Sequence, residues 1–309
     1  MLYWIRSSEV RLFEHLAVED ALLDAPSGKG PVLMIWRGPR SVVMGKNQNP
    51  WKECNLGVIR ERGLLLGRRV SGGGAVYHDP GNLNISWVMD RKVYDPGVLH
   101  GILRDALARF GLKAETAVSG GVRIEGFKVS GAAYCFRQDR VLHHGTLLWK
   151  ADLSTLRAAL SAPRVRLKTH AVASIPARVG NLSDWLPHEE AEDVVEALAG
   201  AAEKHFGARV DWPLEAVDPE DRPGHLQSAE WIWGQTPRFE VQVHVQGDPM
   251  TLRIHRGRME KVRWRGAEWR GAQGARFGPE GCLVLAEHLG VERAEILRAF
   301  GQEGWVWWP

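Results

Sequence analysis

Residues 68–84 hold the densest group of side chains and glycines suited to binding an anion. They read Arg-Arg-Val-Ser-Gly-Gly-Gly-Ala-Val-Tyr-His-Asp-Pro-Gly-Asn-Leu-Asn. Consecutive glycines cost conformational entropy in regular structure, so Gly72, Gly73 and Gly74 indicate positive φ angles or close approach of a ligand. Arginine forks and free backbone N–H groups suit phosphate and carboxylate oxygens. The stretch predicts a site for an anionic or phosphorylated small molecule, with a solvated glycine-rich hairpin as the alternative.

The pattern after these glycines disfavours a dinucleotide-binding loop. Residues 83–89 alternate as a β-strand, whereas a dinucleotide loop leads from a strand into a helix. We therefore expect the glycines to lie between two strands or at a strand edge.

Lys128 is the candidate for a fixed positive charge. It stands between apolar neighbours just after the turn predicted at Glu125-Gly126, in a segment that alternates as a strand. A surface lysine is the commonest outcome for such a residue. The functional alternative is an ammonium held on a phosphate or on an activated carbonyl oxygen, where negative charge develops during acyl or nucleotidyl transfer.

The pair His143-His144 lies in a second alternating strand that continues to Thr146. Adjacent strand residues point to opposite faces, so the two imidazoles do not easily bind one metal ion. We expect one buried histidine that hydrogen-bonds within the site, and the sequence identifies no metal ligands.

Periodicity and capping residues place the elements that must position these side chains. Helices are expected at 9–24, 53–62, 95–110, 156–160, 189–206, 281–289 and 291–300, with a further helix onset at 183–184. Strands are expected at 32–37, 41–45, 83–89, 115–117, 122–124, 127–134, 143–148, 239–245, 250–254 and 261–264. The first two strands are predicted to form a hairpin around Gly38-Pro39.

Size and composition describe an ordinary globular chain of 309 residues, 44% hydrophobic and 25% charged. The net charge of +3 is too small to indicate a nucleic-acid partner. No stretch has the length or character of a membrane span or signal peptide, so we expect a cytoplasmic protein with no membrane partner. Cys54, Cys135 and Cys282 lack the spacing of a disulfide framework or zinc site, and we expect each to be a buried apolar residue.

Residues 211–230 are rich in Pro, Asp, Glu and Gly, the composition of a linker. We therefore predict an α+β protein with a mixed or antiparallel sheet flanked by helices in residues 1–215, and a small α+β domain in residues 225–309.

The sequence resembles the lipoate–protein ligase family along nearly its whole length. The motifs that carry the resemblance occur in the family's order: Arg69 to Asn82, Lys128 to Tyr134, and His143 to Leu148 followed by Asp152-Leu153-Ser154. Residues 49–55 and 173–176 are similar to the mitochondrial lipoyltransferase branch, and residues 231–239 to the start of the family's accessory domain. The resemblance implies a biotin/lipoate ligase-like catalytic domain followed by that accessory domain.

The family resemblance also implies a two-step reaction. Lipoate and ATP, accompanied by Mg²⁺, give lipoyl-AMP and pyrophosphate, and the lipoyl group then passes to a lysine of an acceptor. The implied acceptors are lipoyl-domain proteins: E2 subunits of 2-oxoacid dehydrogenases and the H protein of glycine cleavage. Lys128 matches the essential lysine of the family. The residues that match its substrate and ATP contacts are Arg69, Ser71, Gly72, Gly73, Gly74, His78, Asn82, His144 and Thr146.

One departure from the family leaves alternatives open. Where the family commonly carries an Asn-Asp pair, this chain has Ser119-Gly120-Gly121. A lipoyltransferase that uses preformed lipoyl-AMP is therefore an alternative. An octanoyltransferase would need a cysteine nucleophile beside a base, and a non-catalytic binder of lipoyl proteins would not need Lys128 and Arg69. The acceptor, acyl-chain length and oligomeric state stay open, with a monomer as the working assumption.

Overall fold

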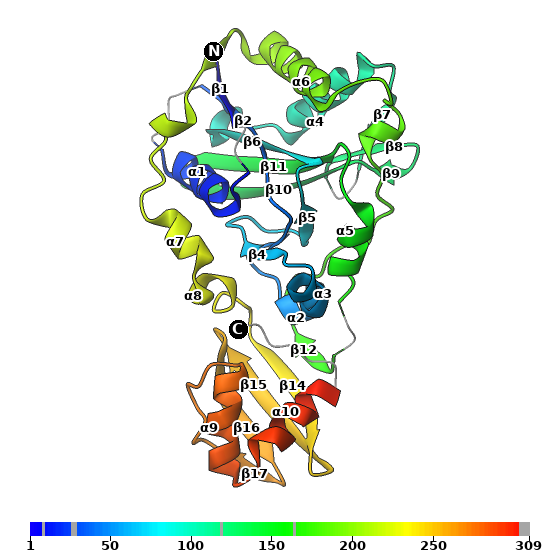
Figure 1. Ribbon diagram of the computed structural model, residues 1–309. Coiled ribbons are helices and arrows are strands. Elements are labelled where there is room, and N and C mark those ends of the chain that lie inside the picture. Colours follow the sequence, from blue (N-terminus) through cyan, green and yellow to red (C-terminus); the bar gives the residue numbers. More distant parts are fainter. Residues whose placement is uncertain (8–9, 26–29, 118–119, 163–164, 303–309) are drawn as a thin grey trace.

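The computed structural model describes residues 1–7, 10–25, 30–117, 120–162 and 165–302. Its centre is a six-stranded sheet of order β10-β11-β6-β2-β1-β13 (Figure 1). These strands are β1 Leu2–Arg6, β2 Val32–Arg37, β6 Asn82–Asp90, β10 Ser130–Arg137, β11 Arg140–Leu148 and β13 Arg209–Asp211. β1 pairs in parallel with β2 and β13, and the other pairs are antiparallel. The mixed sheet confirms the expected α+β class.

Helices cover both faces of this sheet. The three long ones are α1 Leu12–Asp24, α4 Pro96–Ala108 and α6 Ala191–Phe206. α4 and α6 pack on each other and on the face that carries Leu83, Ile85 and Trp87, while α1 packs on the opposite face with Val88 and Leu142. All three helices were predicted, because each carries an apolar stripe of helical period.

The sheet face beneath α1 is unusually polar. Side chains alternate along a strand, so the apolar series of β6 and β11 meets α4 and α6. The other series places buried Asn84, Ser86 and His144, with partly buried Thr146, on the α1 side. Polar groups so far from water need partners or a ligand, and this face holds the candidate site.

Two three-stranded sheets flank the central one. They are β4-β3-β5, with β4 Leu65–Arg68, β3 Ser41–Met44 and β5 Val76–His78, and β7-β8-β9, with β7 Ala114–Thr116, β8 Val122–Ile124 and β9 Phe127–Lys128. The hairpin predicted for residues 32–45 is wrong, because β2 pairs with β1 and β6 while β3 pairs with β4 and β5. Both edges of β2 are occupied within the central sheet, so β3 must join another.

The tight turn before Lys128 is confirmed. Glu125 and Gly126 both have positive φ, 51° and 80°, which joins β8 to β9 by the shortest hairpin connection. Short helices stand beside the β4-β3-β5 sheet: α2 Pro50–Glu53, α3 Leu56–Glu61 and α5 Leu153–Ala159. The helix expected at 53–62 is thus divided, because Cys54 is extended and the Asn55 side chain caps α3 at the N–H of Val58.

The last part of the chain forms a five-stranded sheet of order β12-β14-β15-β16-β17. Its strands are β12 Leu167–Thr169, β14 Phe239–Val245, β15 Asp248–His255, β16 Arg258–Trp264 and β17 Ala267–Trp269, and helices α9 Pro279–Leu289 and α10 Arg293–Gln302 accompany it (Figure 1). β12 comes from before the predicted boundary and was not predicted, because three residues carry too little periodicity.

The predicted linker is more ordered than its composition indicated. It holds α7 Arg222–Gln227, which packs on α1, and α8 Ala229–Ile232. Single 3₁₀ turns occur at η1 Arg91–Val93, η2 Leu182–Asp184 and η3 Leu214–Ala216. In the described ranges, none of the helices combines the length and apolar character needed to span a bilayer.

Candidate functional site

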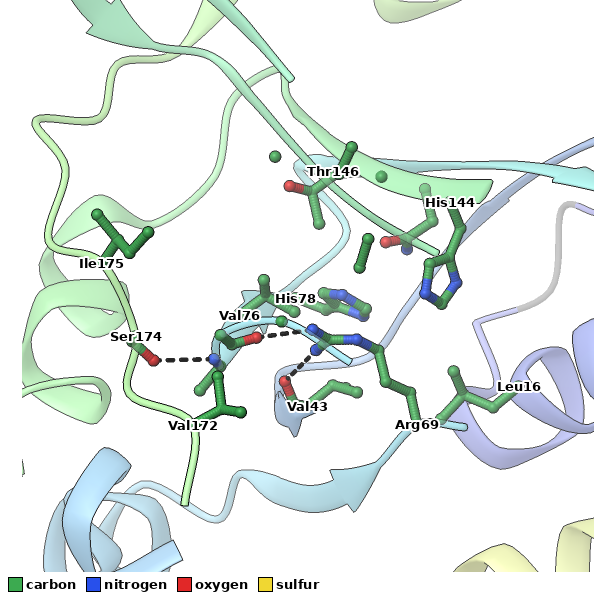
Figure 2. A pocket seen from close by; sticks show the side chains of 18 of the residues that line it. Leu16, Val43, Arg69, Val76, His78, His144, Thr146, Val172, Ser174 and Ile175 are labelled. Atoms are coloured by element: carbon green, nitrogen blue, oxygen red, sulfur yellow. Dashed lines mark hydrogen bonds between the residues drawn. The ribbon is translucent and has the colours of Figure 1, made fainter. Parts of the chain in front are cut away.

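A cavity of about 240 Å³ opens on the polar face of the central sheet. Seven of the residues predicted for the site line it: Arg69, Gly73, Gly74, His78, Lys128, His144 and Thr146. They come from the loop after β4 together with β5, from β9 and from β11, so three separate chain segments meet here. Figure 2 shows the side chains of Arg69, His78 and His144 converging at one end of the cavity and Ser174 and Ile175 at the other. The structure therefore brings these seven residues together around one cavity.

The Arg69 side chain holds the glycine loop in place through hydrogen bonds. Its Nη2 donates to the carbonyl oxygens of Gly72 at 2.6 Å and Gly74 at 2.8 Å, and its Nη1 donates to Val43 O at 3.0 Å. Its Nε donates to Ser71 Oγ at 2.9 Å. The guanidinium has five N–H groups, and most of them are thus occupied by the protein. Arg69 therefore shapes the loop and places positive charge in the cavity wall.

The glycine loop has the expected positive φ at one position, and its observed close contacts are with the protein itself. Gly73 has a φ of +82°, in the left-handed region that favours glycine. A Cβ at Gly74 would lie 3.1 Å from Ser174 Oγ, and one at neighbouring Gly45 would lie 2.2 Å from Gly73 O. The Gly73 position therefore favours glycine for its backbone conformation and the Gly74 position for its close packing on Ser174, whereas a Cβ at Gly72 would meet nothing within 4 Å.

Part of the cavity wall is a buried network centred on Glu19. Its carboxylate accepts from His144 Nδ1 at 2.8 Å, from Trp36 Nε1 at 3.2 Å and from the Ser86 hydroxyl. His144 Nε2 in turn lies 2.6 Å from Ser71 Oγ. Burial acts to raise the pKa of the Glu19 carboxyl, but His144 and these hydrogen bonds hold the pKa below its ordinary 4.5. A carboxylate with such partners remains ionised although it is shielded from water.

Lys128 stands where the cavity meets a second one. Gly131 lies beneath its ammonium, since a Cβ at Gly131 would be 3.4 Å from Lys128 Nζ and 3.7 Å from Thr146 Oγ1. Burial and the nearby Arg123 lower the pKa of Lys128. No acceptor from the described part of the chain hydrogen-bonds to Nζ. The lysine is thus a half-buried cation available to a ligand.

The second cavity has a volume of about 560 Å³ and extends toward α2 and α5. It shares part of its wall with the first, including Lys128, Gly131 and Thr146. Its far side is formed by Lys52, Glu53, Leu156, Arg157 and Leu160. The two cavities are therefore adjacent, and Lys128 lies in the wall that they share.

The segment 172–176 roofs both cavities and is tied to the protein by Glu53. The Ser174 N–H donates to Glu53 Oε2 at 2.8 Å, and Gln48 Nε2 donates to the same oxygen at 3.1 Å and to Ser174 Oγ at 3.0 Å. Ser174 Oγ accepts from the Ala75 N–H at 3.1 Å. This links the roof to the glycine loop.

Three predicted residues lie outside the cavity wall. Ser71 and Gly72 support Arg69 and His144 from behind, as described above. Asn82 donates to Asn84 Oδ1 at 3.1 Å, and Asn84, two residues further along β6, lines the cavity with its Nδ2 unpaired by any described residue. The structure therefore brings Asn82 near the site through Asn84.

Sequence reasoning missed several wall residues, chiefly Glu19, Trp36, Asn84 and Ser174. Glu19 had a visible signal, because it interrupts the apolar stripe of the first helix, where burial of a carboxylate requires partners. Trp36 had none, since it reads as one more residue of a buried strand.

The two adjacent histidines face opposite sides of the sheet, as predicted. His143 contacts α4 instead of the cavity, with Tyr94 OH at 2.9 Å from its Nδ1 and the His100 ring 5.4 Å away between centroids. Burial lowers the pKa of His143 to about 3, and burial with the neighbouring Arg69 lowers that of His78 to about 3. Both rings are therefore neutral at physiological pH. No group of three or more His, Cys, Asp or Glu side chains in the described ranges is arranged to hold a metal ion.

The cysteines fill structural positions. Cys54 and Cys282 are buried as expected, and burial raises the pKa of each thiol to about 12. Cys135 is only partly buried, contrary to the expectation, and it packs against the apolar cluster of α1 instead of lining the cavity. Burial also raises its pKa, whereas a thiol nucleophile needs a lowered one.

More than half of the chain matches a known protein family, and solved structures share its fold. The family model described as the Lipoyl protein ligase A/B catalytic domain matches residues 11–203. P. falciparum LipL1 in complex with lipoate is 21% identical with a TM-score of 0.67, over 98% of each chain. The bipartite lipoate protein ligase of Thermoplasma acidophilum, studied with its E2 lipoyl domain, is 25% identical with a TM-score of 0.64, over 75% of this chain and 94% of that one. Lipoate-protein ligase A bound with ATP is 25% identical with a TM-score of 0.58, over 74% and 93%.

Proposed function

Since the chain belongs to the lipoyl protein ligase A/B family, we propose that it is an ATP-dependent lipoate–protein ligase. It activates lipoate as lipoyl-AMP and transfers the lipoyl group to a lysine of an acceptor protein. The observation that carries the proposal is the unpaired ammonium of Lys128 at the junction of two cavities. One cavity suits an acyl chain and the other a nucleotide.

The smaller cavity suits the apolar part of lipoate. Its walls include Leu16, Val43, Val76 and Ala133, and its buried charges already have protein partners. An acyl chain and dithiolane ring bring no charge of their own, so a wall with internally satisfied charges avoids a desolvation penalty. The carboxylate then lies at the mouth of the cavity, toward Lys128 and Thr146. A relative in the structural comparison is described with bound lipoate.

The chemistry needs a carboxylate to approach an α-phosphate against their mutual repulsion. A carboxylate oxygen forms a bond to the α-phosphorus, the bond to the β-phosphate bridging oxygen breaks, and pyrophosphate leaves with the electron pair. Lys128 offsets the negative charge that accumulates between the two substrates. In the second step the neutral acceptor amine attacks the acyl carbonyl carbon, AMP leaves with the electron pair of the broken carbon–oxygen bond, and the amine proton passes to solvent. The same ammonium stabilises the charge on the carbonyl oxygen. Mg²⁺ enters as part of the ATP substrate.

For the acceptor we propose a lipoyl domain, such as that of a 2-oxoacid dehydrogenase E2 subunit, or the H protein of glycine cleavage. Support comes from the T. acidophilum relative, which is described together with its E2 lipoyl domain. We also propose that residues 1–215 form the catalytic unit and 225–309 an accessory unit. The two share a hydrophobic cluster, in which Trp51 contacts Trp233, Phe239 and Phe277 with ring centroids 5.2 to 5.4 Å apart.

Release of pyrophosphate tests the ligase reaction directly. Purified protein is given lipoate, ATP and Mg²⁺ without any acceptor, and pyrophosphate and lipoyl-AMP are measured. The ligase releases pyrophosphate up to one equivalent per active site and then stops, because lipoyl-AMP stays bound until an acceptor arrives.

The competing function is a transferase that accepts only preformed lipoyl-AMP. The sequence Ser119-Gly120-Gly121 in place of the family's Asn-Asp pair favours it, and Ser119 lies outside the described residues. Such an enzyme transfers lipoate from synthetic lipoyl-AMP but forms no pyrophosphate from ATP. That result would refute the ligase proposal and leave the transfer step intact.

A further inference from the structure

Two cations line the larger cavity, on the side proposed for the nucleotide. The reaction proposed above assigns no role to them. Lys52 on α2 and Arg157 in the last turn of α5 both line its far side. Both are exposed, and neither has a hydrogen bond or ion pair with any described residue. Unpaired cations beside a half-buried cavity are suited to a polyanion.

The nearest carboxylate does not neutralise them. Glu53 also lines this cavity, but it is buried and its Oε2 accepts from the Ser174 N–H and from Gln48 Nε2. Its charge is therefore directed at the roof segment. The cavity retains an excess of positive charge from Lys52, Lys128 and Arg157.

The two helices that carry the cations belong to one fixed assembly. The Asn55 N–H, just after α2, donates to Ala159 O at the end of α5 at 2.8 Å. Arg62, just after α3, donates from Nη1 to Thr155 Oγ1 of α5 at 2.6 Å. The backbone positions of Lys52 and Arg157 are thus fixed relative to each other, and only their side chains move.

The geometry of phosphoryl substitution indicates which part of ATP reaches them. Attacking and leaving oxygens lie roughly in line through the phosphorus. The carboxylate enters from the acyl cavity on one side of Lys128, so the leaving group departs on the opposite side. That direction leads into the larger cavity, away from the acyl chain and toward α2 and α5.

We propose that Lys52 and Arg157 form a binding subsite for the β- and γ-phosphates of ATP and for the pyrophosphate they become. This inference rests on the proposed ligase function. The subsite serves only the first half-reaction, because lipoyl-AMP has lost both phosphates. No proton or electron is transferred to these residues. They offset the charge that the leaving group takes from the broken phosphorus–oxygen bond.

Phosphate binding by Lys52 and Arg157 and a merely structural role predict different effects on the two half-reactions. In the double variant Lys52→Gln/Arg157→Gln we expect the KM for ATP to rise at least tenfold in pyrophosphate release. Transfer from synthetic lipoyl-AMP to an acceptor should stay within twofold of wild type. The matched control is Arg60→Gln, which removes one positive charge from the exposed side of α3, outside the cavity, and should change neither rate. Arg157→Lys in the Lys52 wild-type background should keep most of the ATP affinity.

A binding measurement keeps the subsite testable if the ligase proposal fails. Calorimetric titration of inorganic pyrophosphate into the full-length protein should show binding to wild type and to Arg60→Gln, and at least tenfold weaker binding to the double variant. Equal binding to wild type and double variant would overturn the subsite, as would an equal loss in both half-reactions. Absence of pyrophosphate release from ATP, with pyrophosphate binding as expected, would overturn the ligase proposal alone.

Discussion

The two cavities that meet at Lys128 satisfy their charges in opposite ways. On the acyl side, Glu19 is paired with His144, and most donors of Arg69 are bound to carbonyl and hydroxyl oxygens of the protein. On the nucleotide side, Lys52 and Arg157 have no partner among the described residues. Both sides carry charge, but only the first keeps it internally compensated.

The difference follows from the substrates proposed for each side. An acyl chain offers no counter-charge, so any ion near it must be paired by the protein or be costly to bury. A triphosphate brings its own negative charge, so the protein can leave cations unpaired and exposed until the substrate arrives. Lys128 combines features of both sides. It is half-buried and has a lowered pKa, and no described residue pairs with its ammonium.

Removing the junction charge should have the largest effect. Lys128→Met keeps the length and apolar stem of the side chain and removes the ammonium. We expect pyrophosphate release to fall about 10²- to 10³-fold, the typical cost of deleting one group that stabilises developing charge. Lys113→Met, at an exposed position away from both cavities, is the matched control. Activity within a few-fold of wild type would remove Lys128 from the mechanism.

Breaking the internal compensation on the acyl side should cost stability. Glu19→Gln removes a buried charge that partners His144, and we expect the free energy of unfolding at pH 7 to fall by about 3 kcal/mol. Glu14→Gln, on the same helix and partly exposed, should change it by less than about 0.5 kcal/mol. Chemical denaturation of both variants measures the difference.

The free energy of unfolding that is lost in Glu19→Gln should depend on pH in one direction. The folded-state pKa of Glu19 lies below its ordinary 4.5. The stabilisation is therefore complete above that pH and disappears as the pH falls through the folded-state pKa. The gap between wild type and Glu19→Gln should narrow as the pH falls below 4.5. A gap that widens in acid would show that the carboxylate is not stabilised by its partners.

His143 is a buried titratable group on the other face of the sheet, opposite its neighbour His144 on β11. Its folded-state pKa of about 3 lies below the ordinary 6.5, so it stabilises the neutral, folded form above pH 6.5 and this contribution is lost in acid. Between pH 7 and pH 5 the loss is about 2 kcal/mol. His143→Gln should remove that part of the pH dependence of unfolding, and His188→Gln, at an exposed position, should not. Equal slopes in wild type and His143→Gln would contradict the assigned environment.

Local signals predicted most elements of the fold. The stripes of α1, α4 and α6 and the alternation of β6, β10 and β11 were visible in the sequence, because each arises from spacing along one segment. The hairpin at residues 32–45 failed, because strand partners depend on which sheet edges are free and that is a property of the assembled sheet. The short strand β12 and the helices of residues 222–232 were missed for the same reason, since they are ordered by packing on distant segments.

The sequence by itself identified the family of this protein, from a glycine loop after paired arginines, a lysine after a tight turn and a histidine strand that follow one another in the family's order. It also placed His143 and His144 on opposite faces, because strand geometry alternates whatever the fold. The tertiary structure decided what each charge does. It turned Arg69 inward onto the glycine loop, paired Glu19 with a residue 125 positions away, and brought Lys52 and Arg157 into the cavity of Lys128. Pairing depends on distances between segments remote in sequence, and only the folded chain sets those distances.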